Sequence, residues 1–167
     1  TEMPVLETLV AAVEPWASFY SDSTPTQAVV IFAHVGGMLW GGGLALSADR
    51  AVWKLRTATA EERTRLLAEI GRLHPAVLTG LGISVLSGLL LTAADLEEFA
   101  TSPFWWRKVV MVGFLLANGA WLQRQERRMQ AAPATVLPRW KLLTVVSALS
   151  VTLWFTVVLF GVLLTVV

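Results

Sequence analysis

The chain has 167 residues, of which 55% are hydrophobic and 15% charged, and its formal net charge is +1. Its mean hydropathy is +0.63, and the polar residues are confined to short segments instead of being spread as the solvated surface of a soluble domain requires. The composition therefore predicts an integral membrane protein in contact with the lipid bilayer and gives no indication of nucleic-acid binding. The absence of cysteine excludes disulfides and thiolate ligands.

The first predicted element is an N-terminal segment, residues 1–25. Its apolar residues recur at helical spacing from Leu6 to Val13. Aromatic side chains, which favour the headgroup level of a bilayer, follow at Trp16, Phe19 and Tyr20. This pattern predicts an amphipathic helix that lies at the membrane interface and ends in the SDSTPT turn. The segment is too acidic and too poor in apolar residues for a signal peptide.

Four further segments are free, or nearly free, of charge: residues 26–48, 74–94, 104–123 and 142–167. Each is close to or above the roughly 20 residues that a helix needs to cross about 30 Å of hydrocarbon. The predicted fold class is therefore all-α, an integral membrane four-helix bundle of residues 26–167 preceded by the interfacial helix. A transmembrane barrel is excluded, because its strands would alternate in pieces of about 10 residues.

The distribution of Lys and Arg predicts the orientation. Eleven of the thirteen basic residues lie in the connection between the first and second spans or in that between the third and fourth, and the N-terminal segment has none. By the positive-inside rule, both basic connections are cytoplasmic and both termini lie outside. We expect a location in a cell membrane, the bacterial inner membrane.

The first basic connection contains a capping-box pattern, Thr59 followed three residues later by Glu62. It predicts a short charged helix, EERTRLLAEIGRL, that runs into the second span near Pro75. Within the second span, small side chains recur every four residues at Ala76, Gly80, Ser84 and Gly88. They predict a seam against which another helix packs closely, in this chain or in a homo-oligomer.

His34 is the leading functional candidate, because it lies in the first span, where burial of an ionisable imidazole is costly. Neutral imidazole is the commonest protein donor to transition metals and the usual proximal ligand of haem iron. Gly37 and Gly41 share its helical face, so we expect them to clear space for a flat macrocycle. The alternative is a packing histidine, hydrogen-bonded to a Ser, a Thr or a backbone carbonyl of a neighbouring helix.

Depth in the membrane decides which groups can meet His34. At about 1.5 Å per residue, His34 lies roughly 12 Å and Met111 roughly 10 Å below the outer boundary. Met111 is therefore a candidate sixth ligand to the metal, with Met38, one turn from His34, as the other candidate; the alternative for both is gap-filling core. His74 is expected at the inner boundary, roughly 15 Å from His34 along the membrane normal, as a cap or interfacial residue. No carboxylate is expected inside the spans.

Two basic residues near the outer end of the third span, Arg107 and Lys108, are candidates for neutralising the carboxylates of a macrocycle. Their alternative role is snorkelling to the interface. Copper is a second candidate metal, for which His34 and Met38, four residues apart, would form half a site.

The order of these features resembles a known family. The segments AHVGGMLW, RLHPAVLTGLGISVLSGLLL and FWWRKVVMVGFLLANGAWL resemble the four-helix HemJ-type protoporphyrinogen oxidases, over roughly residues 27–165. They are also similar to the broader group that includes the membrane domain of copper-resistance D proteins. The resemblance implies haem b, a functionally important first-span histidine at His34 and a third-span lysine at Lys108. The chain departs from the family where it has His74 for an asparagine and Asn118 for a histidine.

These observations predict a haem b-binding membrane protein with a redox or electron-transfer role, served by a redox partner or a quinone, with His34 as axial ligand. Three alternatives stay open. The chain is a porphyrinogen oxidase of the HemJ type that depends on Lys108, a copper-handling membrane protein, or a structural, partner-binding subunit without a cofactor.

Overall fold

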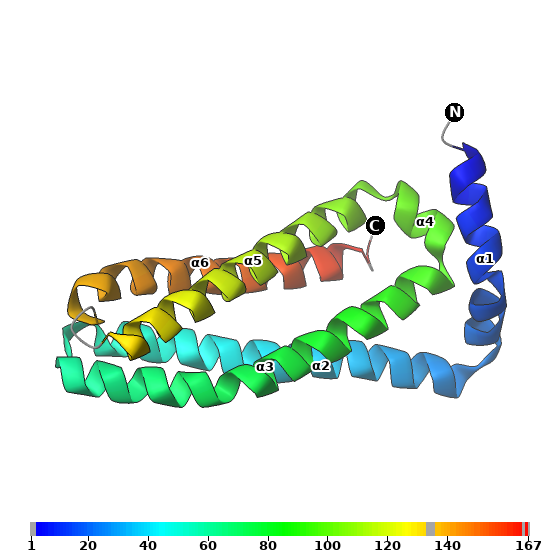
Figure 1. Cartoon of the computed structure of the whole chain (residues 1–167). Helices are drawn as coiled ribbons and strands as arrows, with labels where there is room; N and C mark the ends of the chain where they lie inside the picture. Colours follow the sequence, from blue (N-terminus) through cyan, green and yellow to red (C-terminus); the bar gives the residue numbers. More distant parts are fainter. Residues whose placement is uncertain (1–2, 133–135, 165, 167) are drawn as a thin grey trace.

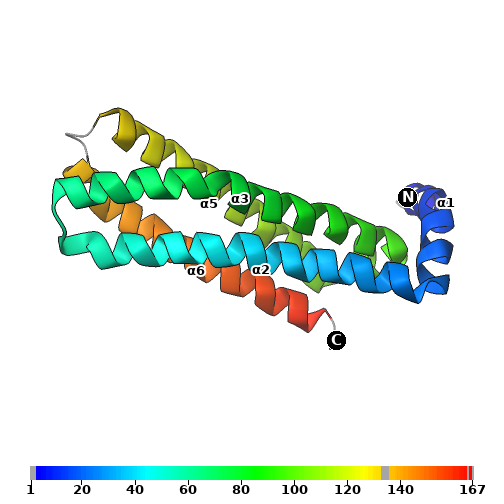
Figure 2. The ribbon, with the colours of Figure 1, turned by 90° about the horizontal axis from the view of Figure 1, so that it is seen from below.

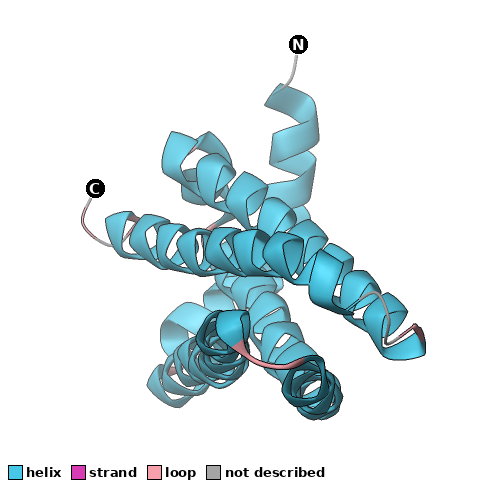
Figure 3. Cartoon of the chain, turned by 90° about the vertical axis from the view of Figure 1, so that its left-hand side faces the viewer, coloured by secondary structure: helices cyan, strands magenta, loops and turns pink. Residues whose placement is uncertain are grey.

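The computed structural model describes residues 3–132, 136–164 and 166, which form helices joined by short loops, with no strand among them (Figure 3). The elements are α1 (Met3–Asp22), α2 (Thr24–Lys54), the short 3-10 helix η1 (Leu55–Thr57), α3 (Ala60–Ala94), α4 (Leu96–Thr101), α5 (Pro103–Ala131) and α6 (Val136–Leu163). The prediction of an all-helical chain is confirmed for these residues.

Three of the helices are long and apolar enough to cross a membrane: Thr24–Thr57, which includes η1, Ala60–Ala94 and Val136–Leu163. They correspond to the first, second and fourth predicted spans, so membrane localisation is supported. Helix α5 is also long, at 29 residues. Its apolar run is shortened by Arg107 and Lys108 at one end and interrupted by Asn118, and the third span stays a prediction.

The long helices pack in two antiparallel pairs. Helix α2 makes its most extensive contact with α3, α5 makes its own with α6, and α6 also packs on α2. Helix α1 lies across one end of these pairs, together with the short α4 (Figures 1 and 2). The indole Nε1 of Trp16 donates a hydrogen bond of 2.8 Å to the carbonyl oxygen of Leu90, which joins α1 to α3.

The predicted small-residue seam is present and closes within the chain, against α2. A Cβ atom on Gly37 would lie 2.7 Å from the carbonyl oxygen of Gly80, and one on Gly80 would lie 2.6 Å from the amide nitrogen of Gly41. Real side chains do not approach backbone so closely, so the two helices meet main chain against main chain.

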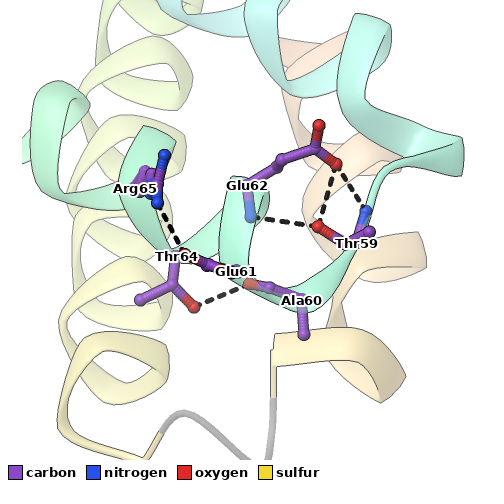
Figure 4. Close-up of polar contacts among 6 residues, drawn as sticks. All are labelled: Thr59, Ala60, Glu61, Glu62, Thr64 and Arg65. Carbon is purple, nitrogen blue, oxygen red and sulfur yellow. Dashed lines mark hydrogen bonds and ion pairs between the residues drawn. The ribbon is translucent and has the colours of Figure 1, made fainter.

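Local sequence fixes the start of α3 as predicted. Thr59 is its N-cap: the Glu62 amide donates to Thr59 Oγ1 at 3.3 Å, and the Thr59 amide donates to Glu62 Oε2 at 2.8 Å (Figure 4). This reciprocal capping box satisfies donors that the first helical turn would otherwise leave free. An ion pair of 2.6 Å between Glu61 and Arg65 follows on the same turn. The helix then continues without a break through Pro75.

Candidate functional site

A cavity of about 760 Å³ lies between the helices at the α1 end, and we call it the outer cavity. Every helix from α1 to α6 contributes to its wall, and His34, Met38, Gly88, Trp105, Lys108 and Gly161 are among the lining residues. Sites for cofactors and small molecules usually enclose about 300–1,000 Å³, so its volume suits an organic ligand.

The imidazole of His34 is half-buried and is held by α3. Its Nδ1 lies 2.8 Å from the carbonyl oxygen of Ser84 and 3.5 Å from the hydroxyl of Ser87. Because a carbonyl oxygen only accepts, Nδ1 carries the proton and donates it, which leaves the lone pair on Nε2. Among the described residues, none hydrogen-bonds to Nε2. The predicted packing contact is confirmed, and it also orients the second nitrogen as metal-binding histidines are commonly oriented.

The two predicted basic residues, Arg107 and Lys108, lie in different surroundings. Lys108 is half-buried and lines the outer cavity, and a Cβ atom on Gly161 of α6 would lie 3.6 Å from its Nζ. Arg107 is exposed, and its guanidinium carbon lies 5.4 Å from the centroid of the Phe104 ring. The structure therefore places one of the two predicted cations in the same cavity as His34.

The two predicted glycines do not clear space beside the imidazole. Gly37 and Gly41 are buried against the backbone of α3, so the space above them holds Gly80 and its neighbours, not a ligand. The prediction is corrected because the face that they share with His34 is the face on which α3 packs. The residue that actually leaves room for the imidazole is Gly88, since a Cβ atom there would lie 3.0 Å from His34 Cε1.

The two methionines of the spans, Met38 and Met111, also differ in their positions relative to the outer cavity. Met111 is partly buried against an apolar cluster built on Leu153, Trp154 and Val157, and it does not appear among the residues that line the outer cavity. This placement corresponds to the gap-filling alternative. Met38 packs on the same cluster and also lines the cavity, so it is the methionine that the structure brings into the compartment of His34.

One carboxylate of the described residues lies in the wall of the outer cavity. Asp95, in the link between α3 and α4, lines the cavity. A hydrogen bond with Asp95 and the like charge of that carboxylate raise the pKa of Glu98, on α4, above its ordinary value. Trp105 Nε1 donates a hydrogen bond of 3.2 Å to the Thr92 hydroxyl nearby.

A second polar site lies at the other end of the helices, and the sequence did not predict it. Asp49 is 2% exposed and Glu126 is 1% exposed, and Glu126 Oε2 lies 3.0 Å from His74 Nε2. One alternative is corrected here: His74 lies within α3 and is a partner of Glu126, so it does not cap a helix. Its expected position at the membrane interface stays a prediction, as does the absence of carboxylates from the predicted spans, because Asp49 and Glu126 lie outside those runs. Helices α2 and α5 continue beyond their charge-free runs, so residues 49 and 126 still lie on these helices, where the neighbouring helices bury them.

No group of three or more His, Cys, Asp or Glu side chains that could hold a metal ion occurs in residues 3–132, 136–164 and 166. Haem makes a different demand, because its macrocycle ligates the iron and the protein supplies only the axial positions. One histidine with an available nitrogen, beside a large cavity that also holds a lysine, meets that demand.

Comparisons with known proteins do not assign this chain to a family. The resemblance to the HemJ-type oxidases stays a prediction, which rests on short motifs around His34 and Lys108. No family model, no curated protein and no solved structure matches the chain.

Proposed function

We propose that this protein binds haem b in the outer cavity, with His34 as axial ligand, and serves as a membrane redox or electron-transfer protein. One observation carries the proposal: Nδ1 of His34 is committed to the carbonyl of Ser84, so the ring that lines this cavity keeps a lone pair on Nε2. A neutral imidazole held in this way is the usual proximal ligand of haem iron.

The other residues of the cavity fit the remaining parts of such a cofactor. Lys108 offers an ammonium group to a propionate, and Val157 and Trp105 offer apolar surface to a macrocycle. Haem supplies the one-electron chemistry when bound, and the chain sets ligation, burial and hydrogen bonding. A redox partner or a quinone would exchange the electron.

The finer topology belongs to the same proposal. Helix α5 is taken as the remaining, third span, which completes a four-helix bundle, because α6 packs along it and its charged residues gather toward its ends. The basic connections then face the cytoplasm and both termini face outside, across the bacterial inner membrane.

An absorption spectrum tests the haem proposal. The full chain, purified from cells with an ample haem supply, is expected to show a Soret band, and His34→Ala to lose it. His74→Gln is the matched control, because it changes the other histidine of the chain at the far end of the helices, and it should retain the band. A colourless wild-type protein would overturn the proposal.

Porphyrinogen oxidation is the second candidate, and the presence of Lys108 and His34 in one cavity favours it. This activity would make the chain a haem-dependent membrane oxidoreductase. It predicts oxidation of a reduced porphyrin, with electrons passed to a quinone, and loss of that turnover in Lys108→Met. A haem-loaded protein with no turnover would exclude this candidate and leave the electron-transfer role.

A further inference from the structure

The end of the molecule opposite the outer cavity contains a smaller cavity of about 170 Å³, which we call the inner cavity. Its polar lining comes from four helices: Asp49 of α2, His74 of α3, Gln123 and Glu126 of α5, and Ser150 of α6. Apolar side chains form the rest of the wall. A buried set of titratable groups from separate helices suggests a function, because an ionisable group inside a membrane protein is costly to keep.

A polar atom of this set and another on the neighbouring Ser147 of α6 lack hydrogen-bond partners. The hydroxyls of Ser147 and Ser150 lie beside the Asp49 carboxylate. Yet Asp49 Oδ2 and Ser147 Oγ, in side chains that are 2% and 0% exposed, make no hydrogen bond within the described part of the chain. Buried polar atoms usually find a partner in protein or in ordered water. The unpaired atoms therefore indicate that something small occupies the site in the working protein.

The cavity volume limits what that occupant is. A site of about 170 Å³ is below the range of about 300–1,000 Å³ that organic ligands usually need. It is ample for several water molecules, because about 10–15 Å³ suffices for one. Water with titratable side chains around it is a medium through which protons move.

The charges around Asp49 determine which side chain of the cluster binds a proton. His74 Nε2 and Glu126 Oε2 lie 3.0 Å apart, so these two side chains are partners of each other. Asp49 faces the hydroxyls of α6 and the like charge of Glu126. Arg63, a buried cation of α3, does not line the inner cavity and is engaged elsewhere, because its Nε donates to the Leu55 carbonyl and its guanidinium lies over the Trp140 ring. A buried carboxylate without a counter-charge is costly and is neutralised by taking up a proton.

The cluster also borders a cavity that has exposed residues in its lining. A second cavity, of about 300 Å³, shares His74, Gln123 and Glu126 with the inner cavity. Its remaining lining includes the exposed Arg127 and Gln130, near the C-terminal end of α5. This end carries the basic connection between α5 and α6.

We propose that the inner cavity is a proton-binding site, in which Asp49 Oδ2 takes a proton from water that reaches it past Arg127 and the His74–Glu126 pair. The transfer moves one proton from hydronium to the carboxylate and leaves water. This function is separate from haem binding, because none of its residues lines the outer cavity.

Infrared difference spectroscopy of the detergent-solubilised full chain tests the site, with or without haem. A protonated carboxyl band that shifts in D2O is expected at mildly acidic pH, absent in Asp49→Asn and unchanged in Glu97→Gln, an exposed carboxyl outside the cavity. Ser147→Ala, which keeps the carboxyl, should shift the band, since it removes a neighbouring hydroxyl. No band in the wild type, or a band that persists in Asp49→Asn, would overturn the proposal.

Two further arms test the occupant and the route. Loss of the band when sodium chloride replaces choline chloride at constant pH would show a sodium site and contradict a proton site. Since the chain has no cysteine, Arg127→Cys can be labelled alone with a bulky maleimide. The label is expected to slow deuterium exchange of the band at least severalfold, whereas the same label at Arg124→Cys, exposed on α5 outside the lining, should not. Equal exchange in both would refute this route.

Discussion

Nδ1 of His34 and the carbonyl oxygen of Ser84 lie 2.8 Å apart, and this hydrogen bond joins α2 to α3 beside the outer cavity. The acceptor is main chain, so the orientation of the ring does not depend on the side chain at position 84. The ring does depend on the missing side chain of Gly88, because a Cβ atom there would lie 3.0 Å from Cε1 and 3.2 Å from Nδ1.

The first prediction follows from that contrast. We expect Gly88→Ala to displace the imidazole by a few tenths of an ångström and to shift or broaden the Soret band of the haem-loaded protein. Ser84→Ala keeps the carbonyl acceptor and is expected to leave the spectrum unchanged. Absorption spectra of the two variants, recorded oxidised and reduced, make the comparison. A normal spectrum in Gly88→Ala would show that the ring is not the iron ligand.

The second prediction concerns the charge in the outer cavity. Lys108→Met removes an ammonium that can meet a propionate, and hydrogen bonds to charged groups contribute about 1.5–3 kcal/mol. Haem affinity should therefore fall by about tenfold or more in a titration. Arg107→Met is the control, because Arg107 is exposed beside Phe104, outside the cavity lining. Equal losses in the two variants would point to a general surface-charge effect.

The third prediction concerns the seam between α2 and α3. Gly80→Ala would place a methyl group 2.6 Å from the amide nitrogen of Gly41, so the helices must separate. Overpacking of this kind typically costs about 1–3 kcal/mol. Gly82→Ala is the matched control on the same helix, because a Cβ atom there meets nothing within 4 Å. Unfolding in detergent should show a lower midpoint for Gly80→Ala alone, and equal midpoints would refute the close contact.

The fourth prediction concerns the start of α3. Thr59→Ala removes the hydroxyl that accepts from the Glu62 amide, and loss of such a cap costs about 1 kcal/mol. Thr57→Ala, an exposed threonine two residues earlier, should change the unfolding free energy little. Chemical unfolding followed by circular dichroism measures both. If the two variants were equally stable, the capping box would contribute nothing measurable.

Much of the fold could be predicted from local patterns. Charge-free runs predicted the three helices that are apolar enough to span, and Thr59 with Glu62 predicted the capping box. These patterns work because they depend on residues a few positions apart. The sequence also made Lys108 a candidate partner of the ligand that His34 would hold, because it lies near the outer end of the third predicted span, and both residues line the outer cavity.

The inner site could not be predicted in the same way. Asp49 and Glu126 lie just past the charge-free runs, and charge alone suggests that the membrane segment has ended there. Their burial depends on α3 and α6, which bring His74 and Ser150 beside them. Gly37 and Gly41 illustrate the same limit. Their spacing shows that one face of α2 has no side chains, but only the packing shows that α3, and not a ligand, contacts this face.

The contact between Gly37 and Gly80 fixes the distance between α2 and α3 beside the outer cavity without any side chain. Two peptide backbones that touch directly cannot adjust as packed side chains do, so the spacing between α2 and α3 is as reproducible as peptide geometry itself. Large side chains that face away from this contact, such as Leu39 and Leu86, can therefore vary among related chains while the position of the imidazole stays the same. The same contact thus allows the outward-facing side chains to vary and fixes the position of the His34 imidazole.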